Sequence, residues 1–161
     1  QREGGGAFTW EEIARYRDKW KKPMLVKGIL HPKDAERAVS LGLDGIVVTN
    51  HGGRQIEALP ASIDVLPEIA STVGKNITII FDSGIRSGID VARAIAAGAD
   101  SAFSGKAFLW SLGALGEVGP KHMANTLIEE IGSTLGQLGC EAVSDLHEIQ
   151  YRHPTAYKTK A

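Results

Sequence analysis

An internal repeat limits what this chain can fold into more than any other feature of its sequence. When residues 27–45 are laid over residues 83–101, many residue types coincide. The pairs include Gly28 with Gly84, Asp34 with Asp90, Arg37 with Arg93, Gly42 with Gly98 and Asp44 with Asp100. Each copy has a loop glycine after an apolar run, an acidic residue where a helix would begin and a glycine just past the helix end. Successive quasi-equivalent strand–helix units are typical of a (β/α)₈ barrel.

Apolar runs alternate with helical segments along the chain. The runs are too continuous in apolar character for strands with one face in water, which is typical of buried parallel strands. We predict strands at residues 24–27, 45–49, 77–81 and 101–104. We predict helices at about 33–41, 64–73, 90–97 and 120–138, and a first helix that starts at a capping box of Thr9 and Glu12. Glycines at 132 and 136 predict a bend or fraying in the last of these.

The alternation predicts an α/β fold with a parallel sheet. Eight strand–helix units take about 250 residues, whereas these 161 residues supply four predicted strands. We therefore predict a TIM (β/α)₈ barrel of which the chain covers about the last four strand–helix units plus C-terminal helices. Residues 1–161 would be the C-terminal half of one domain, with a loop at 1–8 and a polar tail at 151–161. The absence of an initiator methionine at Gln1 also indicates a piece of a longer protein.

Charge and composition argue against several classes of function. Eighteen basic residues stand against nineteen acidic ones, for a net charge of -1 without a basic block, so we expect no nucleic-acid partner. No apolar run approaches the roughly 18 residues that a membrane span needs. The single cysteine, Cys140, cannot form an internal disulfide, which fits a reducing compartment.

The segment IVVTNHGGRQ, residues 46–55, carries reactive side chains where a predicted strand ends. His51 can accept a proton near pH 7, and the planar guanidinium of Arg54 matches a carboxylate in a two-point contact. The two glycines between them let the backbone approach a flat ring or adopt positive φ. The pattern predicts that His51 and Arg54 handle the two ends of one small anionic substrate. A polar loop with a surface histidine is the alternative that this motif alone leaves open.

Three further strand ends carry polar residues. Lys27 closes a buried strand, where its ammonium needs an anion or a polar pocket, and a structural salt bridge would satisfy it equally. The turn at residues 82–86 is expected to leave backbone N–H groups unpaired for a phosphate, with Arg86 as counter-charge. Gly105 and Lys106 follow the fourth strand and are placed to hold the same phosphate from its other side. Two neighbouring loops around one phosphate recur in barrel enzymes.

In this order, VKGI, NHGGRQ, DSGIR and GK resemble the motifs of the FMN-dependent 2-hydroxy acid oxidases and dehydrogenases, which include glycolate oxidase, L-lactate dehydrogenase and mandelate dehydrogenase. The resemblance covers nearly the whole chain. It implies FMN as the cofactor and oxidation of a small (S)-2-hydroxy acid to its 2-oxo acid. It also implies a homo-oligomer, such as a tetramer, that is cytoplasmic, peripheral to the inner membrane or, in a eukaryote, peroxisomal. The substrate side chain and the electron acceptor, whether oxygen, a quinone or a cytochrome, stay open.

The resemblance also implies a role for each motif residue. His51 would be the catalytic base and Arg54 the ligand of the substrate carboxylate. Lys27 would lie against the N1–C2 edge of the flavin, and Thr49 would bond its ring system. The ribityl and phosphate groups would be held by Asp82, Ser83, Gly84, Ile85 and Arg86, with Gly105 and Lys106 completing the phosphate site.

The chain departs from the family pattern at two positions and lacks part of the expected site. The family usually has Asp-Gly-Gly where this chain has Asp82-Ser83-Gly84, and Gly-Arg where it has Gly105-Lys106. Serine suits its position only if the backbone there avoids positive φ, and lysine keeps the charge but loses the two-point fork. The family takes a second substrate arginine, a tyrosine and a histidine-orienting aspartate from the first half of the barrel. We therefore expect these 161 residues to be inactive alone.

Two alternative functions stay open at this point. An IMP dehydrogenase-like barrel would explain the DSGIRSG motif, but it offers no reason for NHGGRQ, and Cys140 lies far from where a catalytic cysteine loop would be. A catalytically incomplete half-barrel that binds phosphate, or serves assembly only, would need no redox chemistry.

Overall fold

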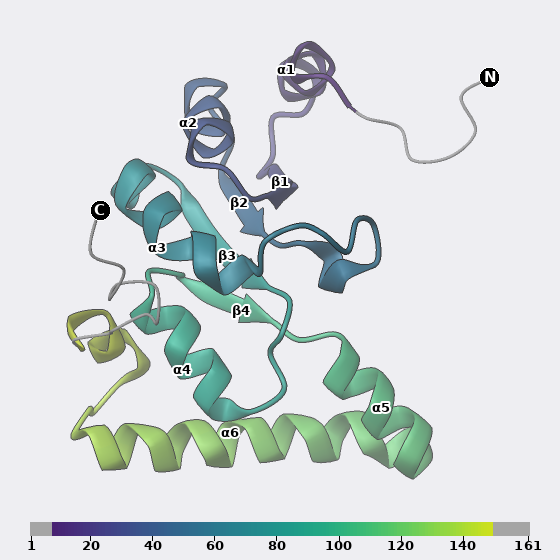
Figure 1. The fold of residues 1–161 in the computed structure, drawn as a ribbon, viewed down its shortest axis with the longest axis vertical. Coiled ribbons are helices and arrows are strands. Elements are labelled where there is room, and N and C mark those ends of the chain that lie inside the picture. The colour runs from purple at the N-terminus through teal and green to yellow at the C-terminus, as the bar shows by residue number, and fades with distance from the viewer. Residues whose placement is uncertain (1–7, 150–161) are drawn as a thin grey trace.

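A computed structural model of the protein describes residues 8–149 (Figure 1). The predicted tail at 151–161, and the predicted loop at 1–8 apart from Phe8, lie outside the described residues. Four parallel strands form one sheet in the order β1-β2-β3-β4. The strands are β1 (Leu25–Ile29), β2 (Gly45–Val48), β3 (Thr78–Asp82) and β4 (Ser101–Phe103). The predicted α/β fold with a parallel sheet is confirmed.

One α-helix follows each strand of the sheet. The helices are α2 (Pro32–Ser40), α3 (Ser62–Val73), α4 (Gly88–Ala96) and α5 (Lys106–Leu115). Figure 1 shows α2, α3 and α4 along one side of the sheet. Because the strands are parallel, their carboxyl ends meet at one edge, and the loops that leave them come together there.

The core lies between the sheet and the helices α2 and α3. All four residues of β2 are buried, as predicted for a strand without a wet face. The fully buried side chains include Ile46 and Ile79 from the sheet and Leu66 and Ile69 from α3. Burying a side chain of this size contributes about 1.5–3 kcal/mol. This layer therefore fixes where β2 and β3 end.

The helix starts follow local hydrogen bonds. Before α1 (Trp10–Lys19), the Thr9 N–H donates to Glu12 Oε2 at 2.8 Å and the Glu12 N–H donates to Thr9 Oγ1 at 3.2 Å, which is the predicted capping box. Helix α3 starts at Ser62, two residues earlier than predicted. The buried Ser62 hydroxyl accepts a hydrogen bond from the Asn50 N–H at 2.9 Å, which ties the start of α3 to the end of β2.

The C-terminal part of the described chain covers α4 and α5. The long helix α6 (Gly119–Leu138) packs against both, as Figure 1 shows. It continues as one helix through Gly132 and Gly136, so the predicted fraying is absent, because packing of one face outweighs the intrinsic cost of the glycines. Four 3₁₀ segments complete the described elements: η1 (His51–Gly53), η2 (Gly74–Asn76), η3 (Gly116–Val118) and η4 (Val143–Glu148). Within residues 8–149, no helix has the length and apolar character to span a bilayer.

Two glycines of this helical layer give opposite stability predictions. A Cβ added at Gly88 would lie 2.5 Å from Glu130 Cβ and 2.5 Å from the Ile131 nitrogen, whereas one added at Gly132 would meet no described atom within 4 Å beyond its chain neighbours and the nearby backbone of its own helix. Gly88→Ala is expected to lower the free energy of unfolding by roughly 2–3 kcal/mol through overpacking. Gly132→Ala should raise it by about 0.5–1 kcal/mol, because alanine is the better helix former. Urea denaturation measures the free energy of unfolding of both variants. Equal changes in the two variants would contradict close packing of α4 on α6.

Candidate active site

A cavity of about 400 Å³ opens at the carboxyl edge of the sheet. Its lining comes from the loops after β2, β3 and β4 and from the first turns of α3 and α5. Nine of the predicted site residues line it: His51, Arg54, Asp82, Ser83, Gly84, Ile85, Arg86, Gly105 and Lys106. The other two, Lys27 and Thr49, both bond the Asp82 carboxylate. The structure thus brings all the predicted site residues together at one edge.

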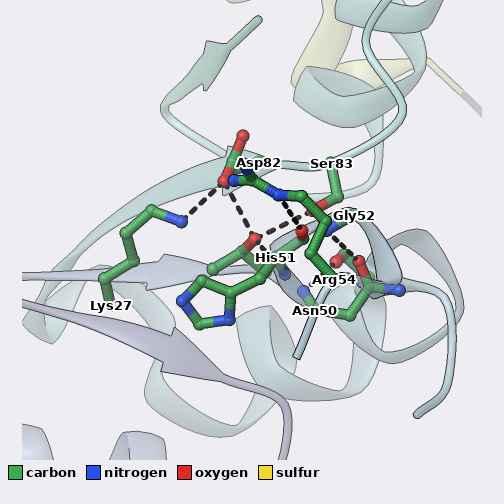
Figure 2. A network of polar contacts seen from close by, with 9 residues as sticks. Lys27, Asn50, His51, Gly52, Arg54, Asp82 and Ser83 are labelled. Carbon is green, nitrogen blue, oxygen red and sulfur yellow. Dashed lines mark hydrogen bonds and ion pairs between the residues drawn. The ribbon is translucent and has the colours of Figure 1, made fainter. Parts of the chain in front are cut away.

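Asp82 is the centre of the polar network in Figure 2. Its Oδ2 accepts hydrogen bonds from Lys27 Nζ at 2.8 Å and from Thr49 Oγ1 at 2.9 Å, so the network joins the ends of β2 and β3 to the middle of β1. Burial alone would raise the pKa of the Asp82 carboxyl. The hydrogen bonds from Lys27 and Thr49, the Lys27 charge and the Ser83 N–H outweigh burial and hold this pKa below its ordinary value. Asp82 is therefore a carboxylate at neutral pH.

The imidazole of His51 lies close to the backbone of β1. Gly28 has a φ of 109° and interrupts the regular pairing of β1 with β2, since Lys27 pairs with Val47 and Ile29 with Val48. A Cβ at Gly28 would approach His51 Cε1 to 3.2 Å. The glycine therefore provides both the backbone conformation and the room for the ring.

Asn50 supplies two of the hydrogen bonds that hold the loop carrying His51. Asn50 Oδ1 accepts from the Gly52 N–H at 2.9 Å, and Asn50 Nδ2 donates to the Pro60 carbonyl at 3.2 Å. His51 itself has a φ of 57°, in the left-handed region. Sequence reasoning did not assign a role to Asn50, although an asparagine directly before His-Gly-Gly is a recognisable Asx-turn signal.

Arg54 shares this loop and the cavity with His51. Its Nε donates to the His51 carbonyl at 3.1 Å, and Figure 2 shows this bond. This contact uses only Nε. The two terminal nitrogens are therefore left to donate side by side in an end-on contact with a carboxylate.

The turn after β3 differs from its prediction. The Arg86 and Ser87 N–H groups both donate to Asp90 Oδ2 at 3.1 Å, and the Gly88 N–H donates to Glu130 Oε2. The prediction of unpaired N–H groups in the turn at residues 82–86 is therefore wrong for Arg86, whose N–H donates to the capping-box carboxylate of Asp90. The first turn of α5, with Gly105 as its N-cap, has no side-chain cap, so anion binding is favoured there instead.

Cationic groups surround the cavity. Arg86 stacks on the ring of Trp110, with Cζ 5.4 Å from the ring centroid. Lys106 Nζ lies 3.4 Å from the Gly52 carbonyl, so α5 reaches back to the His51 loop. Together with Lys27 and Arg54, these side chains give a field that attracts phosphate and carboxylate groups. Sequence reasoning missed Trp110, which no local motif marks.

Ser83 occupies a backbone conformation that is unfavourable for serine. Its φ is 88°, so the condition that the backbone avoid positive φ is not met. The Ser83 hydroxyl bonds Thr49 Oγ1 at 2.8 Å and accepts from the Gly52 N–H at 3.1 Å. These contacts offset part of the strain that a glycine would not have.

Known proteins resemble this chain over most of its described length. The family model described as FMN-dependent dehydrogenase matches residues 2–153. The chain belongs to the FMN-dependent dehydrogenase family. This result favours the predicted family over an IMP dehydrogenase-like barrel.

Several members of the FMN-dependent dehydrogenase family align closely with the chain. The L-lactate dehydrogenase of Pectobacterium atrosepticum is 45% identical over 140 residues, which are 87% of this chain and 36% of the relative. The L-lactate dehydrogenase of Alcaligenes faecalis is 43% identical over 149 residues, 92% of this chain and 39% of the relative. The chain thus spans well under half the length of these relatives.

Solved structures of the family match the fold. A mandelate oxidase structure with 3,3-difluoro-2-hydroxy-3-phenylpropionic acid has a TM-score of 0.85 and 39% identity, and the match covers 89% of this chain and 43% of that one. A mandelate oxidase variant with the monooxide FMN adduct gives a TM-score of 0.85, 39% identity and coverages of 89% and 46%. The described α/β fold therefore corresponds to part of a TIM barrel.

Proposed function

We propose that the protein oxidises an (S)-2-hydroxy acid to the corresponding 2-oxo acid, with FMN at the carboxyl edge of the sheet. The observation that carries this proposal is the convergence of all the predicted site residues on one cavity and the network beside it. The relatives are named for lactate and mandelate, which are both 2-hydroxy acids. The proposal therefore joins the site geometry to the family.

The residues present fit FMN by their donor set. The uncapped first turn of α5, with Lys106 and Arg86 beside it, suits a phosphate group. Gly84 and Ile85 line the cavity between these cations and Asp82, whose carboxylate suits ribityl hydroxyls. The Lys27 ammonium, paired with Asp82, suits the flavin edge that gains negative charge. When bound, FMN supplies the acceptor for two electrons.

His51 and Arg54 would handle the substrate. The terminal nitrogens of Arg54 bind the carboxylate, and His51 takes a proton from the hydroxyl group or from C2, so the imidazole becomes imidazolium as the 2-oxo acid forms. Both residues lie on one short loop, and Arg54 Nε bonds the His51 carbonyl. This bond fixes the base relative to the carboxylate ligand, a positioning effect that can lower a barrier by several kcal/mol.

The hydroxyl of Thr49 suits a supporting role better than a flavin contact. Its single proton and its two acceptor positions can all be used by Asp82, Ser83 and the His51 N–H. The flavin contact that the resemblance implies would have to replace one of these three bonds. We therefore assign Thr49 to the support of the His51 loop.

The whole activity is proposed for a longer protein than these residues. Within the described part of the chain the sheet has two open edges, and Leu25 on β1 and Phe103 on β4 are 42% and 49% exposed. A closed barrel has no such edges. We propose that residues 1–161 form the C-terminal half of one FMN-binding barrel domain and are inactive by themselves. The expectation of a homo-oligomer stays a prediction.

An absorption spectrum of the purified full-length protein tests the function. We expect the visible bands of bound flavin, because Arg86, Lys106 and the uncapped first turn of α5 favour the phosphate end. These bands should bleach when (S)-lactate or (S)-mandelate is added without oxygen, and the (R)-enantiomers should leave them unchanged. A colourless protein that does not take up added FMN would contradict the proposal and favour a half-barrel for assembly.

A further inference from the structure

The Thr49 hydroxyl has three hydrogen-bond partners beside the cavity. Thr49 is fully buried at the end of β2. Its Oγ1 lies 2.9 Å from Asp82 Oδ2, 2.8 Å from Ser83 Oγ and 3.0 Å from the His51 nitrogen. A hydroxyl has one proton to donate and two lone pairs to accept with. The three partners therefore use its one proton and both of its lone pairs.

The chemistry of the partners fixes the direction of every bond. Asp82 is a carboxylate and only accepts, so the Thr49 proton goes to Asp82. The His51 N–H only donates, and it occupies one lone pair of Thr49. The remaining lone pair must accept the proton of Ser83, whose own oxygen accepts from the Gly52 N–H at 3.1 Å. The result is a one-way relay from Gly52 through Ser83 and Thr49 to Asp82. Figure 2 labels Gly52, Ser83 and Asp82 of this relay.

The relay connects two residues whose backbone needs support. His51 has a φ of 57° and Ser83 a φ of 88°, and neither is glycine. Such conformations persist where surrounding contacts hold them. Here the contacts are the His51 N–H on Thr49 and the Ser83 hydroxyl between Thr49 and Gly52. The relay ends on the carboxylate oxygen that Lys27 Nζ contacts at 2.8 Å, so it is anchored on β1 as well.

We propose that Thr49 and Ser83 are positioning residues that hold the His51 loop by this hydroxyl relay. The serine at position 83 thereby links the loop after β3, at the phosphate end of the cavity, to the loop that carries the base. The kinetic consequence rests on the proposed function of His51, whereas the structural consequence does not.

Amide hydrogen exchange of the full-length protein tests the relay directly. Four variants are compared: Thr49→Val removes the hydroxyl at nearly equal volume, Thr49→Ser keeps it, Ser83→Gly removes the second hydroxyl, and Ser71→Ala is the control. The Ser71 hydroxyl bonds only the Glu68 carbonyl within α3 among the contacts of the described residues. The readout is the protection factor of the peptide over residues 49–54, which corrects for side-chain effects on intrinsic exchange.

We expect Thr49→Val to lower protection at His51 and Gly52 about tenfold, because the His51 N–H loses its acceptor. Ser83→Gly should lower it about threefold, since Asn50 Oδ1 still accepts from the Gly52 N–H at 2.9 Å. Thr49→Ser and Ser71→Ala should match the unsubstituted protein. In stopped-flow experiments Thr49→Val should slow flavin reduction about a hundredfold without changing the bound-flavin spectrum. Thr49→Ser should change the rate of flavin reduction less than about threefold.

The possible results distinguish a failure of the relay from a failure of the proposed function. Equal protection in Thr49→Val and Thr49→Ser would overturn the relay. If Thr49→Val does not fold, unchanged protection in Ser83→Gly would overturn it instead. If the unsubstituted protein reduces no flavin, the proposed function fails, and the protection factors still decide whether the hydroxyls hold the loop.

Discussion

Replacing His51 with asparagine in the full-length protein is expected to slow flavin reduction by roughly a thousandfold, the middle of the range for loss of a general base. The amide of asparagine cannot take the substrate proton, whereas the binding of flavin does not depend on the imidazole. The bound-flavin spectrum should therefore stay unchanged. Rapid mixing with (S)-lactate or (S)-mandelate under anaerobic conditions measures the rate.

The structure determines which substitution isolates this effect. With a φ of 57°, position 51 lies in the left-handed region, which asparagine tolerates better than glutamine. His51→Gln should add a loss of stability to the loss of the base, and His51→Asn should separate the two. His122→Asn on the exposed face of α6 is the matched control. A His51→Asn protein that loses FMN and keeps its turnover would remove His51 from the role of base.

Arg54→Lys is expected to raise the KM for the hydroxy acid by roughly ten- to a hundredfold, since one charge-assisted hydrogen bond contributes about 1.5–3 kcal/mol. Lysine keeps the positive charge but offers no pair of parallel donors. It also cannot reproduce the bond from Nε to the His51 carbonyl. Steady-state kinetics with (S)-lactate and (S)-mandelate measure the change.

A neutral substrate analogue shows whether the carboxylate is the group that Arg54 recognises. The amide of the same hydroxy acid lacks the charge, so Arg54→Lys should narrow the difference in KM between acid and amide. Arg15→Lys on α1, where the Arg15 side chain is 72% exposed, is the matched control. An unchanged KM for the acid in Arg54→Lys would place Arg54 outside the substrate site.

Sequence reasoning located the site because parallel strands bring their carboxyl ends to one edge. The short motifs at those ends, such as His51 to Arg54, needed only the strand positions to be placed together. The helix start after β3 was predicted incorrectly, although Ser87 followed by Asp90 has the spacing of a capping box. Glu130, whose carboxylate accepts a hydrogen bond from the Gly88 N–H, is distant in sequence, and no local signal connects it to that turn.

The amino-acid sequence by itself determined the strand–helix alternation, the parallel sheet and the identity of the residues at its carboxyl edge, because periodicity and turn chemistry are local properties. Only the tertiary structure decided how those residues contact one another. The Lys27–Asp82 pair and the bonds of Thr49 with Asp82 and Ser83 join residues that are 33 to 55 positions apart along the chain, and Ser83, with its positive φ, is one of them. Distances and hydrogen-bond directions of this kind arise only when packing of the core fixes the strand ends relative to one another.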